Sequence, residues 1–268
     1  MYGRKPLCGL DRSVRRFKRR LPLYMFVLAV AAFALAFAFP QENGGAVIHT
    51  PPVKALTAGG TGPVRPESHG VEPDIPSGED GEWMLALVNP WNPLPEDYTV
   101  KVKALSGGHS VDERCYPDLQ DMMDACRREG LSPVICSSYR TAEKQASLFQ
   151  NKVARLMARG FSRENAETEA AKSVARPGTS EHQLGLAVDI VDVGNQNLDS
   201  SQAGTAVQKW LMEHCWEYGF ILRYPEDKSE VTGIIYEPWH YRYVGKDAAA
   251  AIYEEGMCLE EYLAGEAV

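Results

Sequence analysis

The stretch "TSEHQLGLAVDIVD", residues Thr179–Asp192, places a carboxylate, Asp189, in the middle of an apolar strand. Alternation along a strand sends Asp189 to the face opposite its neighbours Val188 and Ile190. A carboxylate on a half-buried face is costly unless another group pairs with it or binds it. The pattern therefore predicts a strand over Leu186–Val191 and a binding partner for Asp189.

Two histidines are suited to join Asp189 in binding one divalent metal ion. His182 lies seven residues before the aspartate, and His240 ends the motif "EPWH", which begins at Glu237. Three protein ligands with nitrogen or oxygen donors leave the fourth position of a catalytic zinc site to water. The chain has no HExxH motif, so this is not that arrangement. We expect a zinc site on His182, Asp189 and His240.

Glu237 is the candidate general base. It precedes His240 by three residues and is not needed as a ligand, so it is free to take a proton from water and return it to the leaving amine. A regular strand would send residues three apart to opposite faces. Pro238 cannot donate to a ladder, so we expect a bulge or a strand end that turns Glu237 and His240 toward one point.

Each of these signals is weak when taken singly. A lone histidine in a strand or loop is more often structural, Asp189 could be a capped or salt-bridged carboxylate, and Glu237 could be a solvated edge residue. The combination of three ligand types with an adjacent carboxylate is what favours a metal site.

The motifs resemble those of a known family. The pattern Ser180-x-His182-x-x-Gly185-x-Ala187-x-Asp189, followed by Glu237-Pro238-Trp239-His240, resembles the VanY-type D-alanyl-D-alanine carboxypeptidases of the M15 family of zinc peptidases. "LVNPWNPLPEDY" and "SSYRTAEKQ" are also similar to segments of that family, and the similarity extends from about Trp83 to Gly245. The resemblance implies zinc on the three candidate ligands, a catalytic Glu237, and an arginine, Arg140, that binds substrate and supports the developing oxyanion.

Arg140 suits that role physically. A guanidinium binds a free carboxylate or a polarised carbonyl through paired donors. The alternative is a surface ion pair, for which Glu143 is near in sequence. Four further residues are expected to line the substrate pocket: Ser138, Gln145, Ser180 and Trp239.

The body of the chain, residues 82–268, is predicted to be one α+β zinc-peptidase domain with a small antiparallel or mixed sheet flanked by helices. Expected helices cover 116–128, 142–158, 162–175, 207–218 and 246–263, and expected strands cover 131–138, 186–191, 220–224 and 233–244. The residues expected to face the core are Leu119, Met122, Met123 and Cys126 in the first helix and Phe149, Val153, Leu156 and Met157 in the second.

The N-terminal residues predict a membrane anchor. Residues 1–20 contain eight basic side chains and one acid. Residues 21–39 contain no charge, and this stretch has about the length of a bilayer-spanning helix. The basic flank predicts a cytoplasmic N-terminus and an extracytoplasmic body. Cleavage after a signal peptide, at a site such as Ala36-Phe37-Ala38, remains the alternative. Residues 40–81, with eight Gly and seven Pro, are expected to form a disordered linker.

The charge of the chain argues against one class of partner, and its cysteines allow either a disulfide or free thiols. Beyond residue 20 the chain has 20 basic and 35 acidic residues, a net charge of −15, which argues against nucleic acid as a partner. The body has five cysteines and no CxxC pair: Cys115, Cys126, Cys136, Cys215 and Cys258. Cys126 and Cys136 flank a helix-to-strand turn and could pair, or could be free thiols.

These observations together predict a membrane-anchored zinc carboxypeptidase that removes the C-terminal D-alanine from peptidoglycan stem peptides. An L,D-carboxypeptidase or an endopeptidase acting on the same polymer is the enzymatic alternative. A metal-stabilised, non-catalytic wall-binding module is the other alternative, but such a module has no need of Glu237 beside its metal.

Overall fold

The computed structural model describes residues 82–265. The predicted basic segment, apolar span and linker, residues 1–81, lie outside the described residues. None of the helices between residues 82 and 265 combines the length and apolar character of a bilayer-spanning segment. The strands are β1 (Val102–Ala104), β2 (Ser110–Asp112), β3 (Pro133–Ser137), β4 (Ala187–Asp192), β5 (Phe220–Leu222) and β6 (His240–Tyr243). The α-helices are α1 (Tyr116–Arg128), α2 (Ala142–Met157), α3 (Arg163–Ala171), α4 (Ala206–His214), α5 (Ser229–Thr232), α6 (Lys246–Glu255) and α7 (Leu259–Ala264).

The sheet that carries the site has the strand order β3-β4-β6-β5, and each neighbouring pair is antiparallel. β1 and β2 form a separate antiparallel pair. The expected α+β architecture is therefore confirmed, with antiparallel rather than mixed sheets. β4 lies between β3 and β6, and its side chains are buried on both faces: Val188, Asp189 and Ile190 are each at most 2% exposed. The expectation of a half-buried strand face was therefore wrong, since even the face that carries Asp189 has almost no exposed surface.

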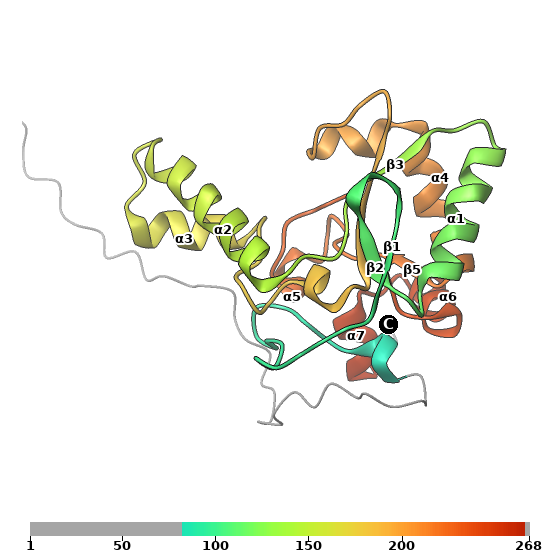
Figure 1. The fold of residues 1–268 in the computed structure, drawn as a ribbon, viewed down its shortest axis with the longest axis horizontal. Helices are drawn as coiled ribbons and strands as arrows, with labels where there is room; N and C mark the ends of the chain where they lie inside the picture. The colour runs from blue at the N-terminus through green and yellow to red at the C-terminus, as the bar shows by residue number, and fades with distance from the viewer. Residues whose placement is uncertain (1–81, 266–268) are drawn as a thin grey trace, which may run out of the picture. The chain divides into compact units, whose positions relative to one another are not determined.

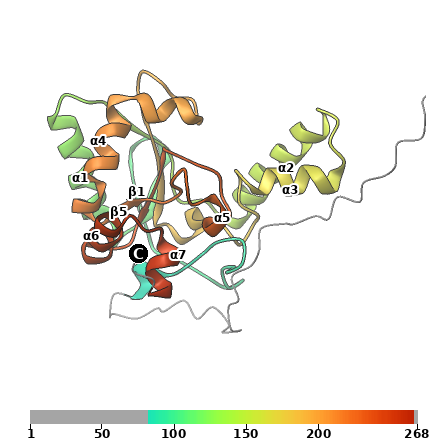
Figure 2. The ribbon, with the colours of Figure 1, turned by 180° about the vertical axis from the view of Figure 1, so that it is seen from behind.

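Helices α1 and α4 cover one face of the sheet and lie side by side in both views (Figure 1, Figure 2). The predicted inner face of α1 is buried as expected, and it packs with β4 and with the aromatic side chains of β5 and β6. The main core lies between these two helices and the sheet. The opposite face of the sheet, which carries Asp189 and His240, is thus left for the candidate site.

Helices α2 and α3 form a hairpin on the other side of the molecule from α1 and α4 (Figure 1). Thr141 caps α2 by accepting a hydrogen bond from the backbone of Lys144, as its position before the helix predicts. The hairpin has a small apolar cluster of its own: Phe149, Val153, Leu156, Ala166 and Ala170. Met157, expected to face inward, is 41% exposed because it is the last residue of α2 and extends past that cluster.

Two predicted elements near the C-terminus differ from the structure. The single helix expected over 246–263 is two helices, because Gly256 adopts a left-handed conformation (φ 65°) that ends α6. Cys258 then starts α7, with its backbone N–H donating to the Glu261 side chain. The strand expected over 233–244 begins only at His240, because a turn precedes it: the His240 N–H donates to the carbonyl of Glu237.

All five cysteines of the described body are free thiols. Cys136 is exposed, and the other four are buried. Of the two alternatives for Cys126 and Cys136, the structure has the free thiols. Burial raises the pKa of the Cys215 thiol to about 12, so this side chain is an inert part of the core.

Candidate metal centre and active site

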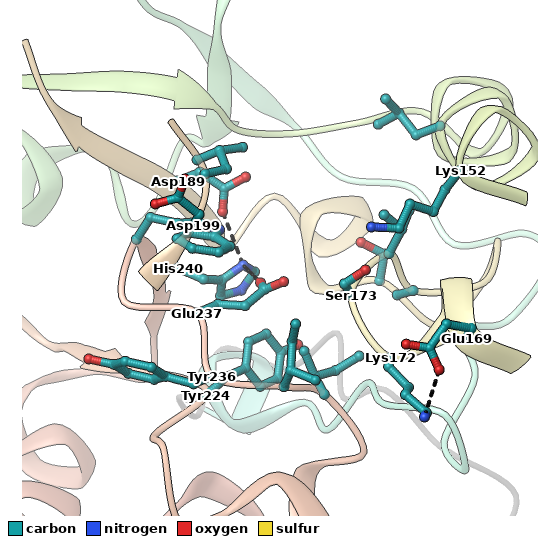
Figure 3. Close-up of a pocket in the computed structure, with 18 of the residues that line it drawn as sticks. Lys152, Glu169, Lys172, Ser173, Asp189, Asp199, Tyr224, Tyr236, Glu237 and His240 are labelled. Atoms are coloured by element: carbon teal, nitrogen blue, oxygen red, sulfur yellow. Dashed lines mark hydrogen bonds and ion pairs between the residues drawn. The ribbon is translucent and has the colours of Figure 1, made fainter. Parts of the chain in front are cut away.

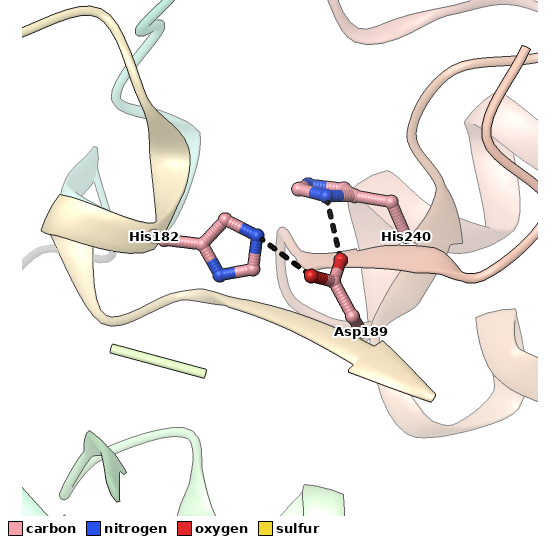
Figure 4. Close-up of side chains that lie close together, drawn as sticks. All are labelled: His182, Asp189 and His240. Atoms are coloured by element: carbon pink, nitrogen blue, oxygen red, sulfur yellow. Dashed lines mark ion pairs between the residues drawn. The ribbon is translucent and has the colours of Figure 1, made fainter. Parts of the chain in front are cut away.

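The register of the sheet brings Asp189 and His240 together. Asp189 on β4 pairs directly with His240 on β6, and on its other side it pairs with Ser137 on β3. Directly opposed residues in antiparallel strands share a face, with Cβ atoms about 4.5–5.5 Å apart. Asp189 Oδ1 accordingly lies 3.1 Å from His240 Nδ1 (Figure 4).

His182 reaches the same point from the connection that leads into β4. It lies in the short helix η3 (Glu181–Leu184), which ends at Gly185 with a left-handed φ of 79°. A Cβ on Gly185 would lie 3.0 Å from the backbone nitrogen of Asp112, so both conformation and space favour glycine at this turn. The turn sends the chain from His182 straight into the strand that carries Asp189.

The hydrogen bonds of His182 identify its free nitrogen. Nδ1 lies 2.9 Å from the carbonyl oxygen of Ser138 and donates to it. Nε2 is then the nitrogen with a free lone pair, and it lies 3.3 Å from Asp189 Oδ2 (Figure 4). The two histidine rings meet edge-on, with centroids 4.9 Å apart.

These three side chains fit a divalent metal ion. One ligand atom from each of His182, Asp189 and His240 lies within 4.8 Å of the other two, and all three side chains are buried. Asp189 Oδ1 has no hydrogen-bond partner in the part of the chain that the structure describes, which is rare for a buried carboxylate oxygen. One carboxylate and two imidazoles are donors that zinc accepts in catalytic sites. The fold therefore brings the predicted ligand set together.

Glu181, which the sequence analysis did not single out, lies behind His240. Its Oε2 is 3.5 Å from His240 Nε2, and neither atom has a hydrogen-bond partner among the described residues. Its Oε1 accepts from Arg223 Nε and Arg242 Nη1, each at 2.7 Å. Such a carboxylate favours the proton on Nε2 and leaves Nδ1 free to face Asp189 and a metal. The only signal in the sequence was its position between Ser180 and His182 of the motif.

The charges of this cluster set its pKa values. Burial alone would raise the pKa of Asp189, but His182 and His240 hold it well below its usual range. Burial, followed by the positive Arg140, lowers the pKa of His182 to about 4. Burial also opposes the charge of His240, but the carboxylates of Asp189 and Glu181 outweigh it and raise its pKa to about 9. In the absence of metal, His240 therefore holds a proton at neutral pH.

Glu237 stands at the edge of the cluster, on the turn before β6. Pro238 and Trp239 form that turn, which is the strand end expected at the proline. Glu237 Oε2 lies 3.8 Å from His240 Nδ1, and the residue is 7% exposed. Burial raises the pKa of its carboxyl group to about 8, against the opposing pull of His240. A carboxyl group that exchanges its proton near neutral pH suits acid–base work.

Arg140 is held beside the cluster by three neighbours. Its guanidinium donates to Ser137 Oγ at 2.8 and 3.0 Å, to Gln145 Oε1 at 3.2 Å and to Asp189 Oδ2 at 3.0 Å. The ion pair that the structure shows is with Asp189 rather than the surface pair considered with Glu143. With 17% of the side chain exposed, Arg140 reaches the cleft, and its role toward substrate stays a prediction.

A cleft of about 710 Å³ opens onto the cluster (Figure 3). Of the residues expected to line it, Arg140, Ser180 and Trp239 do so. Ser138 and Gln145 are 3% and 0% exposed and lie behind that wall. They support it instead: the Ser138 carbonyl accepts from His182, and Gln145 accepts from Arg140. Sequence alone does not separate a residue on a wall from one behind it.

Comparisons with known proteins agree with this site. Residues 108–246 match the family model VanY, described as D-alanyl-D-alanine carboxypeptidase. The D-alanyl-D-alanine carboxypeptidase of Enterococcus faecalis is 43% identical over 249 residues, which cover 92% of this chain and 91% of that protein. A mutant of the vancomycin resistance D,D-pentapeptidase VanY from the VanB-type resistance cassette, crystallised in complex with Zn(II), is 50% identical, with a TM-score of 0.62 over 68% of this chain and 99% of that one.

A second solved structure, the LdcB LD-carboxypeptidase, is 35% identical, with a TM-score of 0.57 over 69% of this chain and 88% of that one. The similarity to VanY proteins thus extends over nearly the whole chain in sequence and over the domain in structure, at high identity. The chain therefore belongs to the VanY family of D-alanyl-D-alanine carboxypeptidases.

Proposed function

We propose that this protein is a zinc-dependent carboxypeptidase that removes the C-terminal D-alanine from peptidoglycan stem peptides. The observation that carries the proposal is the meeting, on one cleft, of the buried ligand set with a further carboxyl group, Glu237, 3.8 Å from His240 Nδ1. A non-catalytic wall-binding module would need only the ligands. The names of the relatives, a D-alanyl-D-alanine carboxypeptidase and a VanY protein bound to Zn(II), support the substrate and the metal.

His182 Nε2, Asp189 and His240 Nδ1 would hold the zinc. Zinc bound there would polarise the scissile carbonyl and lower the pKa of a water molecule. Glu237 takes the proton from the attacking water and returns it to the departing amine of D-alanine. Glu181 keeps the His240 ring in the tautomer that presents Nδ1.

Arg140 supports the negative charge that develops during the reaction and contacts the substrate. Its guanidinium is fixed by Ser137, Gln145 and Asp189, so it is already in place before the substrate binds. A fixed planar donor beside the metal ligands is the arrangement that stabilises an oxyanion or the terminal carboxylate.

The test is a product analysis with the purified full-length protein and zinc. Three matched peptides are compared: a pentapeptide ending in D-Ala-D-Ala, the tetrapeptide with one terminal D-Ala, and a longer peptide with the bond in its interior. We expect release of D-alanine from the pentapeptide and much slower cleavage of the other two. Preferred cleavage of the tetrapeptide would assign an L,D-carboxypeptidase, the activity in the name of the LdcB structure. If the zinc-loaded protein cleaves none of these peptides, the non-catalytic wall-binding module becomes the supported function.

We also propose that the domain works outside the cytoplasm, at the end of a membrane anchor. The uncharged residues 21–39, the basic residues before them and the Gly- and Pro-rich residues 40–81 support this. Protease treatment of intact cells tests the orientation, since only an extracytoplasmic domain is then cleaved.

A further inference from the structure

Helix α2 and the turn that follows it present a row of three cations to the cleft. Lys152, Arg155 and Arg159 all line it. Lys152 and Arg155 lie three residues apart on one face of α2, and Arg159 follows in the turn after the last helical residue, Met157. The Lys152 side chain points from α2 across the cleft toward Glu237 and His240 (Figure 3). The wall opposite the metal cluster is therefore basic.

This basic wall stands out in an acidic domain. Residues 140–176, which include α2 and α3, contain eight basic and four acidic side chains, a net charge of +4. The rest of residues 82–265 contains 10 basic and 24 acidic side chains, a net charge of −14. Three of these cations, Lys152, Arg155 and Arg159, line the cleft, where Glu169 is paired with Lys172, and their charge indicates an anionic ligand there.

The three cations are available to such a ligand. Among the ion pairs of residues 82–265, none involves Lys152, Arg155 or Arg159, whereas Lys172, also on the cleft, is paired with Glu169 at 2.7 Å. Arg155 uses only its Nε, to the Asn151 carbonyl. The field of Lys152 also reaches the general base: burial raises the pKa of Glu237, and Lys152 is among the charges that lower it.

We propose that Lys152, Arg155 and Arg159 form an anion-binding subsite that binds free carboxylates of the stem peptide on the acyl side of the scissile bond. This inference rests on the proposed function. Lys152 and Arg159 are seven residues apart along the last turns of α2 and the turn that follows it, which corresponds to about 10 Å at the rise of a helix. An extended peptide covers that length in about three residues. A carboxypeptidase leaves a single residue on the amine side of the cut, which is too short to fill the row, so the row faces the acyl side.

The subsite predicts a preference for stem peptides whose carboxylates are free over those in which they are amidated. The wall also offsets the repulsion that the acidic remainder of the domain exerts on an anionic substrate. Because Arg155 and Arg159 are exposed, each contact should contribute on the scale of a surface ion pair. We therefore expect about a threefold preference per carboxylate, and about tenfold for a peptide with two.

The experiment compares matched peptides ending in D-Ala-D-Ala that carry Glu or Gln at two positions within the three residues before the cut. kcat/KM is measured for the wild type and for the triple variant Lys152→Gln/Arg155→Gln/Arg159→Gln. The ratio of kcat/KM for the Glu peptide to kcat/KM for the Gln peptide should fall to about one in the triple variant. It should also shrink in the wild type at 1 M salt, where the Debye length is about 3 Å.

A matched control separates the subsite from overall charge. Lys144→Gln removes one charge from the same helix, at an exposed position that does not line the cleft, and should keep the full preference. Lys152→Gln removes the same charge from the cleft and should lower it about threefold. Equal effects of these two variants, or equal kcat/KM for Glu and Gln peptides in the wild type, would overturn the subsite and leave the proposed function intact.

Binding gives a readout that does not depend on cleavage. In Glu237→Gln, the affinity for fluorescent Glu and Gln peptides is measured by anisotropy, with a short glycerol phosphate oligomer as competitor. Tighter binding of the Glu peptide, lost when the triple substitution is added, supports the subsite even if the wild-type protein cuts no peptide, an outcome that would refute only the proposed function. Tight binding of the oligomer without discrimination between peptides would instead assign the wall to a phosphate polymer and overturn the inference.

Discussion

Replacing Glu181 with glutamine should weaken zinc binding, although Glu181 is not itself a candidate metal ligand. Glu181 Oε1 accepts from Arg223 and Arg242, so the carbonyl oxygen of glutamine takes that place. The amide NH₂ then faces His240 Nε2, where the carboxylate oxygen stood at 3.5 Å. Two donors oppose each other unless His240 moves its proton to Nδ1. Nδ1 is the nitrogen that faces Asp189, so the ring loses its free donor for zinc.

The magnitudes follow from these contacts. Loss of a partner that orients a ligating histidine weakens metal binding by about 10–100-fold. Stability should also fall. Both arginines lose the charge of their partner: Arg223 keeps the carboxylate of Glu260, at 2.7 Å, but Arg242 keeps only neutral acceptors, which are the glutamine oxygen and the carbonyls of Met84, Ala86 and Tyr243. Removing one member of a buried ion pair costs about 3–5 kcal/mol, and the retained hydrogen bonds put this case near 3 kcal/mol.

Zinc affinity is measured by competition with a chromophoric chelator, and the free energy of unfolding by urea titration of the metal-free protein. Glu260→Gln is the matched control, because Glu260 pairs with Arg223 and has no contact with either histidine. It should lower stability and leave zinc affinity unchanged. A folded Glu181→Gln protein that binds zinc as tightly as the wild type would refute the role assigned to Glu181.

Further outcomes are expected for the metal ligands, for Glu237, for the pH dependence of His240 and for Arg140. Alanine at His182, Asp189 or His240 should each lower zinc occupancy from about one per chain, as metal analysis of the purified protein will show; full occupancy in all three variants would contradict the ligand set. Glu237→Gln should bind zinc normally and lose about 10²-fold or more in turnover, and wild-type rates would exclude Glu237 as the base. Zinc affinity should rise with pH, by about tenfold per unit between pH 7 and 9, because the metal displaces the proton of His240, whose pKa is about 9; a flat profile in a chelator titration would contradict this. That proton stabilises the metal-free fold below the ordinary pKa of histidine, and urea titrations should show its contribution disappear as pH rises through 9. Arg140→Ala should lose one to two decades in kcat/KM on peptides with a free C-terminus, Arg140→Lys should recover only part, and equal rates on C-terminally amidated peptides would show that Arg140 does not read the terminal carboxylate.

Local patterns were sufficient for much of the fold and for the ligand set. The helix over Tyr116–Arg128 and the cap at Thr141 were predictable because periodicity and capping depend on neighbours in the chain. The cluster of candidate ligands could be expected for a chemical reason: a carboxylate inside an apolar strand requires a partner wherever that strand lies, and the structure places His182 and His240 beside Asp189. Glu237 followed from its proximity to His240.

Only the tertiary structure decided how these parts meet. The register that sets Asp189 opposite His240, and the cover that buries both faces of β4, arise from strands more than forty residues apart. The sequence around Glu181 does not reveal the two arginines that bind it, because Arg242 lies on β6 and Arg223 directly follows β5. The same holds for the basic row of α2, which becomes part of a site only where the hairpin faces the metal cluster. A short segment determines its side-chain chemistry and its local geometry, whereas the proximity of distant segments depends on packing that no short segment specifies.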